Sequence, residues 1–200
     1  AMITKGNWRP SVRFEPLHSD RPMIRFPGAE GGPEWAGGAS DPKDGLFIIN
    51  TNNYSFVEKL TKRPDGSWVS NSTDFLDKKT NMYCQTPPWG MLTAVNVSTG
   101  DVAWQVPLGV SDQAPEGKKD TGRPSYGGSI TTAAGLTFIG GTDDSRFRAF
   151  DSKTGKELWT TKLDYSAHAT PLTWKGKDGR QYIGITASGG SFLNSPSGGD

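Results

Sequence analysis

The sequence predicts an all-β fold made of repeated four-stranded antiparallel units, and three observations support this prediction. The chain of 200 residues contains 26 glycines and 14 prolines, so its backbone turns often. Aromatic residues make up 10% of the chain, with seven tryptophans. Many short strands closed by tight turns account for both features better than long amphipathic helices do. The third observation is an internal repeat.

The strongest repeat is a hairpin whose two copies lie 55 positions apart. The copies read LTAVNVSTGDVAWQVPL at 92–108 and FRAFDSKTGKELWTTKL at 147–163. In each copy a side chain, Asn96 or Asp151, can accept hydrogen bonds from backbone N–H groups two residues on. The glycine that follows supplies the positive φ that closes the turn. Because a second strand then leads to Trp104 or Trp159, each copy predicts a β-hairpin.

A weaker repeat of strand, turn and strand precedes these hairpins. Its copies begin at Trp35-Ala-Gly-Gly, Tyr126-Gly-Gly-Ser and Ala169-Thr-Pro. Together the repeats have a period of about 40 to 45 residues, which is typical of propeller blades. We therefore expect a β-propeller fragment of about two and a half four-stranded antiparallel blades. The predicted domain 28–200 consists of a blade at 29–108 with an insertion at 51–88, a blade at 122–163 and a half blade at 166–200.

The remaining segments predict little regular structure. Residues 1–27 contain four prolines and are interpreted as an extended lead-in. The insertion 51–88 and the segment 109–125 are polar and lack a steady period, so we expect long loops with at most short secondary structure. A propeller needs about 4–8 blades to close. We therefore expect missing blades, or self-association, to cover the last strand edge.

Composition excludes several classes of partner and site. The chain has 22 basic and 21 acidic residues mixed along its length, so no nucleic-acid partner is expected. The sequence contains no apolar run of about 18 residues, the length that would indicate a membrane span. Nicotinamide, P-loop, zinc-protease and nucleophile-elbow motifs are absent from the sequence. The single cysteine, Cys84, is either free and buried or paired with a cysteine outside this chain.

Several motifs resemble one enzyme family. The segment from Ala149 to Trp159, AFDSKTGKELW, resembles the tryptophan-docking motif of the pyrroloquinoline quinone (PQQ) dehydrogenases, and the segment from Ala94 to Trp104 is a second copy. Other segments between about residues 21 and 190 resemble the membrane glucose dehydrogenase and quinate dehydrogenase branch. They are GGPEWAGG at 31–38, CQTPPWG at 84–90, WQVPLG at 104–109 and GLTFIG at 135–140. The resemblance implies an eight-bladed propeller, when complete, that holds PQQ and Ca²⁺ near its axis.

The resemblance implies that this chain is the C-terminal part of a PQQ- and calcium-dependent dehydrogenase. Such an enzyme oxidises a sugar, polyol or other alcohol in the periplasm and passes electrons to a quinone or cytochrome. The calcium ligands and the usual base would lie mostly outside this chain, so the catalytic residues are unknown and the fragment alone is not expected to be active. The alternative is a noncatalytic propeller, a binding or assembly platform that retains only the blade-packing motifs.

The resemblance also implies three cofactor-contacting residues. Glu34 and Trp35 lie where the family has an axis-facing Asn-Trp pair. Glu34 could hydrogen-bond a cofactor group, approach Ca²⁺ or act as a base, and the alternative is a solvated turn residue. Ser191 takes the approximate place of a family histidine that this sequence lacks, which places a glucose-type site in doubt.

Three more residues are interpreted as structural. Trp104 and Trp159 occupy the position where the family packs an indole between adjacent blades. His168 begins a predicted strand, and the family has Gln at its position. We therefore expect a structural role for His168 rather than catalysis, although histidine titrates in a useful range.

Overall fold

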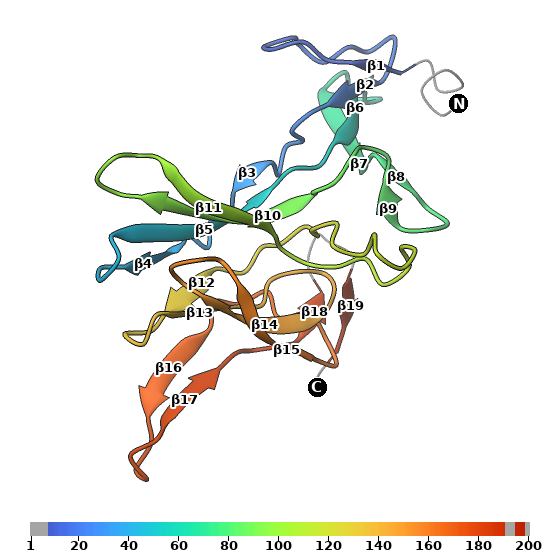
Figure 1. The fold of residues 1–200 in the computed structure, drawn as a ribbon. Helices are drawn as coiled ribbons and strands as arrows, with labels where there is room; N and C mark the ends of the chain where they lie inside the picture. The colour runs from blue at the N-terminus through green and yellow to red at the C-terminus, as the bar shows by residue number, and fades with distance from the viewer. Residues whose placement is uncertain (1–7, 191–194, 199–200) are drawn as a thin grey trace. The chain divides into compact units, whose positions relative to one another are not determined.

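The computed structural model describes residues 8–190 and 195–198, and these residues form strands, turns and loops without a helix (Figure 1). No helix that could cross a membrane is therefore present in this part of the chain. The contacts divide the described residues into two compact units. One unit contains the described residues up to Gly32 together with Asn53–Pro87, and the other contains Pro33–Asn52 together with the described residues from Pro88 onward.

The second unit contains the predicted blades, which confirms the all-β propeller fold class. The first blade pairs β4 (Ala39–Asp41), β5 (Leu46–Asn52), β10 (Gly90–Asn96) and β11 (Val102–Pro107) in that order, and β3 (Gly32–Pro33) also pairs with β5. The second blade pairs β12 (Ser129–Thr131), β13 (Leu136–Ile139), β14 (Arg146–Asp151) and β15 (Glu157–Lys162). A half blade consists of β16 (Leu172–Lys175) and β17 (Gln181–Gly184), and a short ladder joins β18 (Gly189–Gly190) to β19 (Ser195–Ser197).

The two repeated hairpins have the same turn and the same register. Asn96 Oδ1 accepts hydrogen bonds from the N–H groups of Ser98 and Thr99, and Asp151 Oδ1 accepts the equivalent bonds from Lys153 and Thr154. Ala94 faces Trp104 across the first ladder, and Ala149 faces Trp159 across the second. Each ladder shifts its register directly after that alanine. The Asx side chain and the turn glycine thus dictate one local structure twice.

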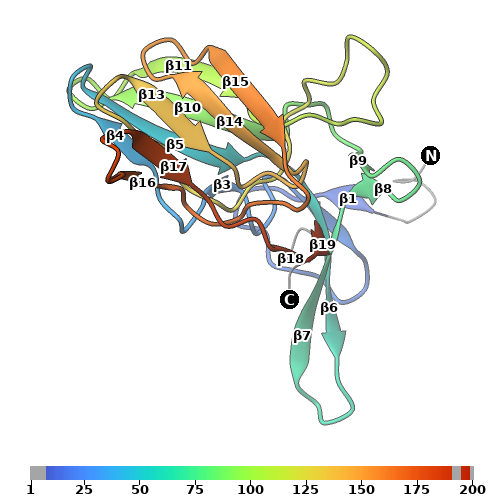
Figure 2. The same cartoon turned by 90° about the horizontal axis from the view of Figure 1, so that it is seen from below.

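The core of the second unit lies between the two blades. Its buried side chains come from both sheets: Leu46, Ile48, Leu92, Ala94, Leu108, Ile139 and Phe150. Trp104 packs against this cluster, and its Nε1 donates a hydrogen bond to the carbonyl oxygen of Ser152 at 3.0 Å. Since Ser152 lies in the hairpin turn of the second blade, Trp104 joins one blade to the next, as predicted. Figure 2 shows the ribbons of the two blades.

A pair of turn glycines tests this docking contact. Gly100 and Gly155 occupy the same repeat position with φ of 79° and 72°. A Cβ on Gly155 would lie 2.5 Å from the Trp104 ring, whereas a Cβ on Gly100 meets nothing within 4 Å. We expect Gly100→Ala to cost about 1 kcal/mol of unfolding free energy through backbone strain, and Gly155→Ala to cost about 1–3 kcal/mol more through overpacking. Urea unfolding of the two variants measures the difference, and equal losses would contradict the contact.

The first unit corrects the prediction of long loops at 51–88. Its sheet pairs β1 (Arg9–Pro10), β2 (Met23–Arg25), β6 (Phe56–Lys62) and β7 (Trp68–Asp74) in that order, and β8 (Leu76–Asp77) pairs with β9 (Met82–Tyr83). The loop prediction was wrong for β6 and β7 because most of β7 is exposed on both faces, so its sequence shows no alternation of apolar and polar residues. The expected loop at 109–125 is present, with only an isolated bridge at Ser125.

Part of the predicted lead-in is a strand of the first unit. Strand β2 pairs with β6, and Met23 within it is fully buried. Ile24, Val57 and Phe75 form a small core with Trp8 packed against it. The described part of the lead-in is therefore grouped with the insertion, and the structure divides the chain elsewhere than at residue 28.

Candidate functional site

Three loops precede the innermost strands of the successive blades, and we call them the inner loops. They are residues 34–38 before β4, 125–128 before β12 and 168–171 before β16. A Cβ on Gly128 would lie 2.8 Å from the carbonyl oxygen of Ala36 and 2.8 Å from Oγ1 of Thr170. Glycine at position 128 therefore allows the three inner loops to meet, and the half blade continues the arrangement of the two complete blades.

Glu34 is a half-buried member of the first inner loop, and its carboxylate is not simply solvated. Its Oε1 accepts a hydrogen bond from Nδ2 of Asn52 at 2.7 Å. Asn52 is 2% exposed and also contacts the backbone of Ser125 in the second inner loop. Strand β5 thus places an amide where it reaches both loops. The family resemblance indicated Glu34, but nothing in the sequence pointed to Asn52.

The other two predicted cofactor contacts have different outcomes. Trp35 follows Glu34 and is 86% exposed, so its indole presents a free apolar face at the first inner loop. Ser191 lies outside the described residues, and its role stays a prediction. The structure therefore brings Glu34 and Trp35 together on one loop and does not place Ser191.

His168 is held in the third inner loop by contacts that suit the structural role that we expected. Its Nδ1 lies 3.0 Å from the carbonyl oxygen of Gly141, and its ring meets Tyr126 edge-on with the centroids 6.2 Å apart. Burial lowers the pKa of the imidazole, although hydrogen bonding to the backbone of Gly141 opposes this shift. Burial thus favours the neutral imidazole, and Nδ1 donates to the Gly141 carbonyl because a carbonyl oxygen can only accept.

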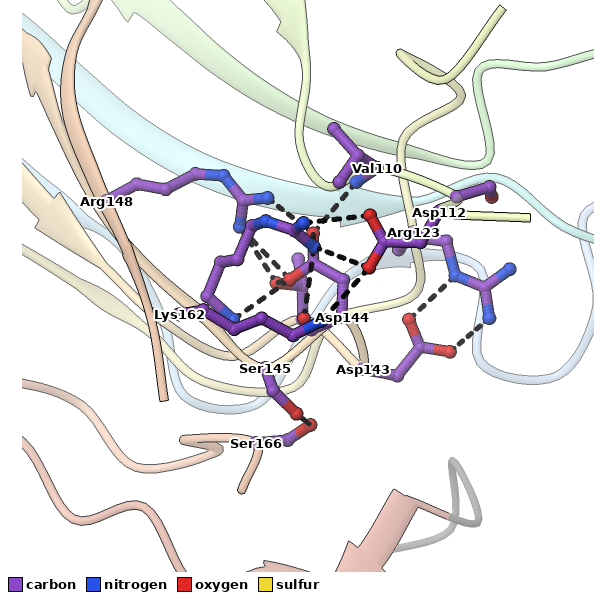
Figure 3. A network of polar contacts seen from close by, with 12 residues as sticks. Val110, Asp112, Arg123, Asp143, Asp144, Ser145, Arg148, Lys162 and Ser166 are labelled. Atoms are coloured by element: carbon purple, nitrogen blue, oxygen red, sulfur yellow. Dashed lines mark hydrogen bonds and ion pairs between the residues drawn. The ribbon is translucent and has the colours of Figure 1, made fainter. Parts of the chain in front are cut away.

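A network of charged side chains in the second unit was not predicted from the sequence (Figure 3). Asp143 accepts two hydrogen bonds from the buried guanidinium of Arg123. The next residue, Asp144, accepts hydrogen bonds from the N–H of Val110, from the hydroxyl of Thr142 and from Arg148. Burial acts to raise the pKa of Asp144, but these donors together hold it below its usual value.

The charged network borders a cleft of about 800 Å³ between β11 and the second blade. Several ionic groups in its lining pair with one another: Arg146 with Asp112, and Arg148 with Glu157. The lining includes neither Glu34 nor Trp35. We therefore place the candidate site at the inner loops and assign the charged network to folding.

Cysteine and metal-binding groups add nothing to the candidate site. Cys84 is exposed and forms no disulfide among the described residues, so the alternative of a buried cysteine was wrong. Partial desolvation and the nearby charge of Asp77 raise the pKa of its thiol. Within residues 8–190 and 195–198, no group of His, Cys, Asp and Glu side chains could hold a metal ion.

Comparison with known proteins gives the family of this chain. Residues 2–183 match the sequence profile of the PQQ glucose/ethanol/alcohol dehydrogenase beta-propeller domain. The chain belongs to this family. The match covers both complete blades and the half blade as far as Ile183 in β17, and it agrees with the resemblance inferred from the docking motifs.

Curated relatives of the family are much longer than this chain. The large subunit of glycerol dehydrogenase from Gluconobacter thailandicus is 33% identical over 92% of the chain, which spans 30% of that protein. A probable quinate dehydrogenase (quinone) from Xanthomonas campestris pv. juglandis is 34% identical over 89% of the chain, which spans 27% of it. The chain thus corresponds to less than a third of either relative.

Solved structures support the same fold. A europium-containing methanol dehydrogenase is 26% identical with a TM-score of 0.55, and the match covers 74% of this chain and 23% of that protein. The quinohemoprotein alcohol dehydrogenase from Comamonas testosteroni is 22% identical with a TM-score of 0.59, over 84% of this chain and 24% of that protein. At that identity the second likeness concerns the fold alone.

Proposed function

We propose that this chain is the C-terminal part of the propeller of a PQQ-dependent dehydrogenase that oxidises a sugar, polyol or other alcohol. The observation that carries the proposal is the family match over residues 2–183. Relatives named as glycerol, quinate and glucose dehydrogenases support this range of substrates. When bound, PQQ supplies the oxidation chemistry by accepting two electrons from the alcohol. The role left to this chain is to hold and orient the cofactor.

Two residues of the first inner loop fit a planar cofactor that carries a hydrogen-bond donor. The indole of Trp35 is exposed and offers an apolar face against which a flat ring can pack. The Glu34 carboxylate is held by Asn52 and can accept a hydrogen bond from a donor group of the cofactor. Ser191 remains a proposed third contact. We assign no catalytic base within the chain.

Calcium does not fit the described residues by themselves. They contain no group of acidic, histidine or cysteine side chains that could bind a metal. Glu34 is a single carboxylate, whereas Ca²⁺ takes about 6–8 oxygen ligands. No step in this proposal therefore passes through Ca²⁺.

The partners and location are proposed from the family. A quinone acceptor is in line with relatives named quinate dehydrogenase (quinone), and a cytochrome acceptor is the alternative. We also propose that the protein is periplasmic. Further blades, or a second copy, would cover Trp159, which is 47% exposed here although Trp104 is seated against the neighbouring blade.

Reconstitution of the full natural protein tests the proposed function. We expect PQQ with Ca²⁺ to raise the thermal unfolding midpoint, because a ligand at 100 times its Kd stabilises the native state by about 2.7 kcal/mol. Dye-linked oxidation of sugars, polyols and primary alcohols should follow. If neither a thermal shift nor oxidation of any of these substrates is observed, the proposal is overturned and a noncatalytic platform is favoured.

Glu34→Ala tests whether the first inner loop contacts PQQ. We expect about 10-fold weaker PQQ binding, the effect of losing one hydrogen bond to a charged group. Glu30→Ala is the matched control, because Glu30 is also half-buried and accepts a hydrogen bond from Tyr54, but lies in the other compact unit. Fluorescence titration gives both affinities. Equal affinities for the wild type and Glu34→Ala would remove Glu34 from the site.

A further inference from the structure

Asn52 ends strand β5 as a polar side chain that is almost fully buried. It is 2% exposed. A buried primary amide is costly unless its two N–H groups and its oxygen find partners. The partners of Asn52 therefore show which parts of the fold the residue joins.

All three hydrogen-bonding groups of the Asn52 amide are occupied. Its Oδ1 accepts the backbone N–H of Ser125 at 2.9 Å. Its Nδ2 donates to the carbonyl oxygen of Ser125 at 3.1 Å and to Glu34 Oε1 at 2.7 Å. The amide thus pairs with the backbone of the second inner loop on one side and orients a carboxylate of the first inner loop on the other.

We propose that Asn52 is a positioning residue that fixes the Glu34 carboxylate for contact with PQQ, an inference that rests on the proposed function. The bond from Asn52 to Glu34 is short and charge-assisted, and such bonds are stronger than neutral ones. Only an amide provides this arrangement, because it donates to Glu34 and accepts from Ser125 with one rigid group. An aspartate at position 52 would place a carboxylate oxygen, which cannot donate, against Glu34 and the Ser125 carbonyl.

Asn50 provides a matched control on the same strand. It lies two residues before Asn52 on the same face of β5, is fully buried, and donates from Nδ2 to Ser125 Oγ at 2.8 Å. Its bond is thus to the same loop residue as that of Asn52, and it makes no hydrogen bond to Glu34. A variant at Asn50 reports on burial and on the Ser125 contact without the bond to the carboxylate.

The test is a double-mutant cycle on PQQ affinity in the full natural protein. We expect Asn52→Ala to weaken PQQ binding about 10-fold, and Asn52→Ala combined with Glu34→Ala to bind no more weakly than Glu34→Ala alone. Asn50→Ala combined with Glu34→Ala should show independent, multiplied effects. Asn52→Ser serves as a second variant if Asn52→Ala does not fold, because it keeps a polar group in less space.

The outcomes separate this inference from the proposed function. If the wild type does not bind PQQ, both are overturned. If Glu34→Ala weakens binding but the Asn52 and Glu34 effects multiply, the positioning role is overturned and the proposed function stands. Equal coupling of Asn50 and Asn52 to Glu34 would also overturn it, because general loosening of β5 would then explain both. The same cycle on thermal unfolding without PQQ should show coupling between Asn52 and Glu34, and its absence would contradict the contact itself.

Discussion

Replacing Asp144 by alanine should destabilise the protein by about 3–5 kcal/mol, because the buried guanidinium of Arg148 would keep only the half-exposed Glu157 as an ionic partner. Asp144 accepts hydrogen bonds from Arg148 (Figure 3), and the two side chains are only 3% and 2% exposed, so solvent screens this pair little. Asp144 also accepts hydrogen bonds from Val110 and Thr142, which would lose their acceptor. Urea unfolding of the full natural protein measures the loss.

Asp112→Ala is the control within the same network. The Asp112 side chain is 46% exposed and pairs with Arg146 and Lys162 near the surface, where solvent screens the charges. We expect a loss below about 1 kcal/mol. Similar losses for Asp144→Ala and Asp112→Ala would show that burial does not decide the strength of these pairs.

The same pair gives a pH dependence with a definite sign. The pKa of Asp144 is below its usual value in the folded protein, since Arg148 and the other donors outweigh the effect of burial. The stabilisation is therefore complete above the unfolded carboxyl pKa of about 4 and is lost as the pH falls through the lowered folded value. The stability difference between the wild type and Asp144→Ala should shrink below about pH 4.

The sequence was sufficient to predict the structure of a turn where one residue type satisfies a local backbone requirement. Asn96 and Asp151 cap their turns, Gly100 and Gly155 take a positive φ, and both features can be read without any tertiary contact. The resemblance to the docking motif then predicted that the tryptophan after each turn packs between blades, a half-buried position that suits an indole with one N–H.

Sequence reasoning failed where burial depends on distant parts of the chain. Arg148 reads as a solvated charge between apolar neighbours, but β14 is a central strand that is buried on both faces, and so Arg148 needs Asp144. In the sequence Asn52 is one polar residue among several. Its positioning role depends on hydrogen bonds with Glu34 and Ser125, which reach it only when two blades have formed. Strand β7 was missed for the opposite reason, since it is exposed on both faces.

One local signal for β7 was present. The tight turn between β6 and β7 contains Pro64-Asp65-Gly66, a combination typical of turns between two strands. Asp65 Oδ1 accepts the N–H of Ser67, as such a turn requires. Greater weight on that turn and on the β-branched residues beside it would have predicted the hairpin.

Trp104→Ala should cost about 3 kcal/mol, because it opens a cavity between the two blades and removes a hydrogen bond. The indole packs on the interblade core and on Gly155, and its Nε1 donates to the Ser152 carbonyl. Trp104→Phe keeps most of the apolar contact and loses the donor, so we expect a smaller loss of about 1 kcal/mol. Chemical denaturation of the full natural protein distinguishes the two effects.

Trp159 extends this prediction to the surface that the second blade leaves open. It matches Trp104 in strand position and contacts Phe147 edge-on, yet it is 47% exposed, and its Nε1 has no acceptor among the described residues. A half-exposed indole contributes much less to the unfolding free energy than a docked one. Trp159→Ala should therefore destabilise the protein only slightly when only the described contacts are present.

The full natural protein should behave differently if a further blade or a second copy covers Trp159. A hairpin turn like that at Ser152 would then accept the indole N–H, and Trp159→Ala should cost nearly as much as Trp104→Ala, about 3 kcal/mol. Dependence of this loss on protein concentration would indicate a second copy, whereas independence would indicate a blade of the same chain. A loss well below that of Trp104→Ala at every concentration would contradict the proposal, because the repeated motif would then dock only once.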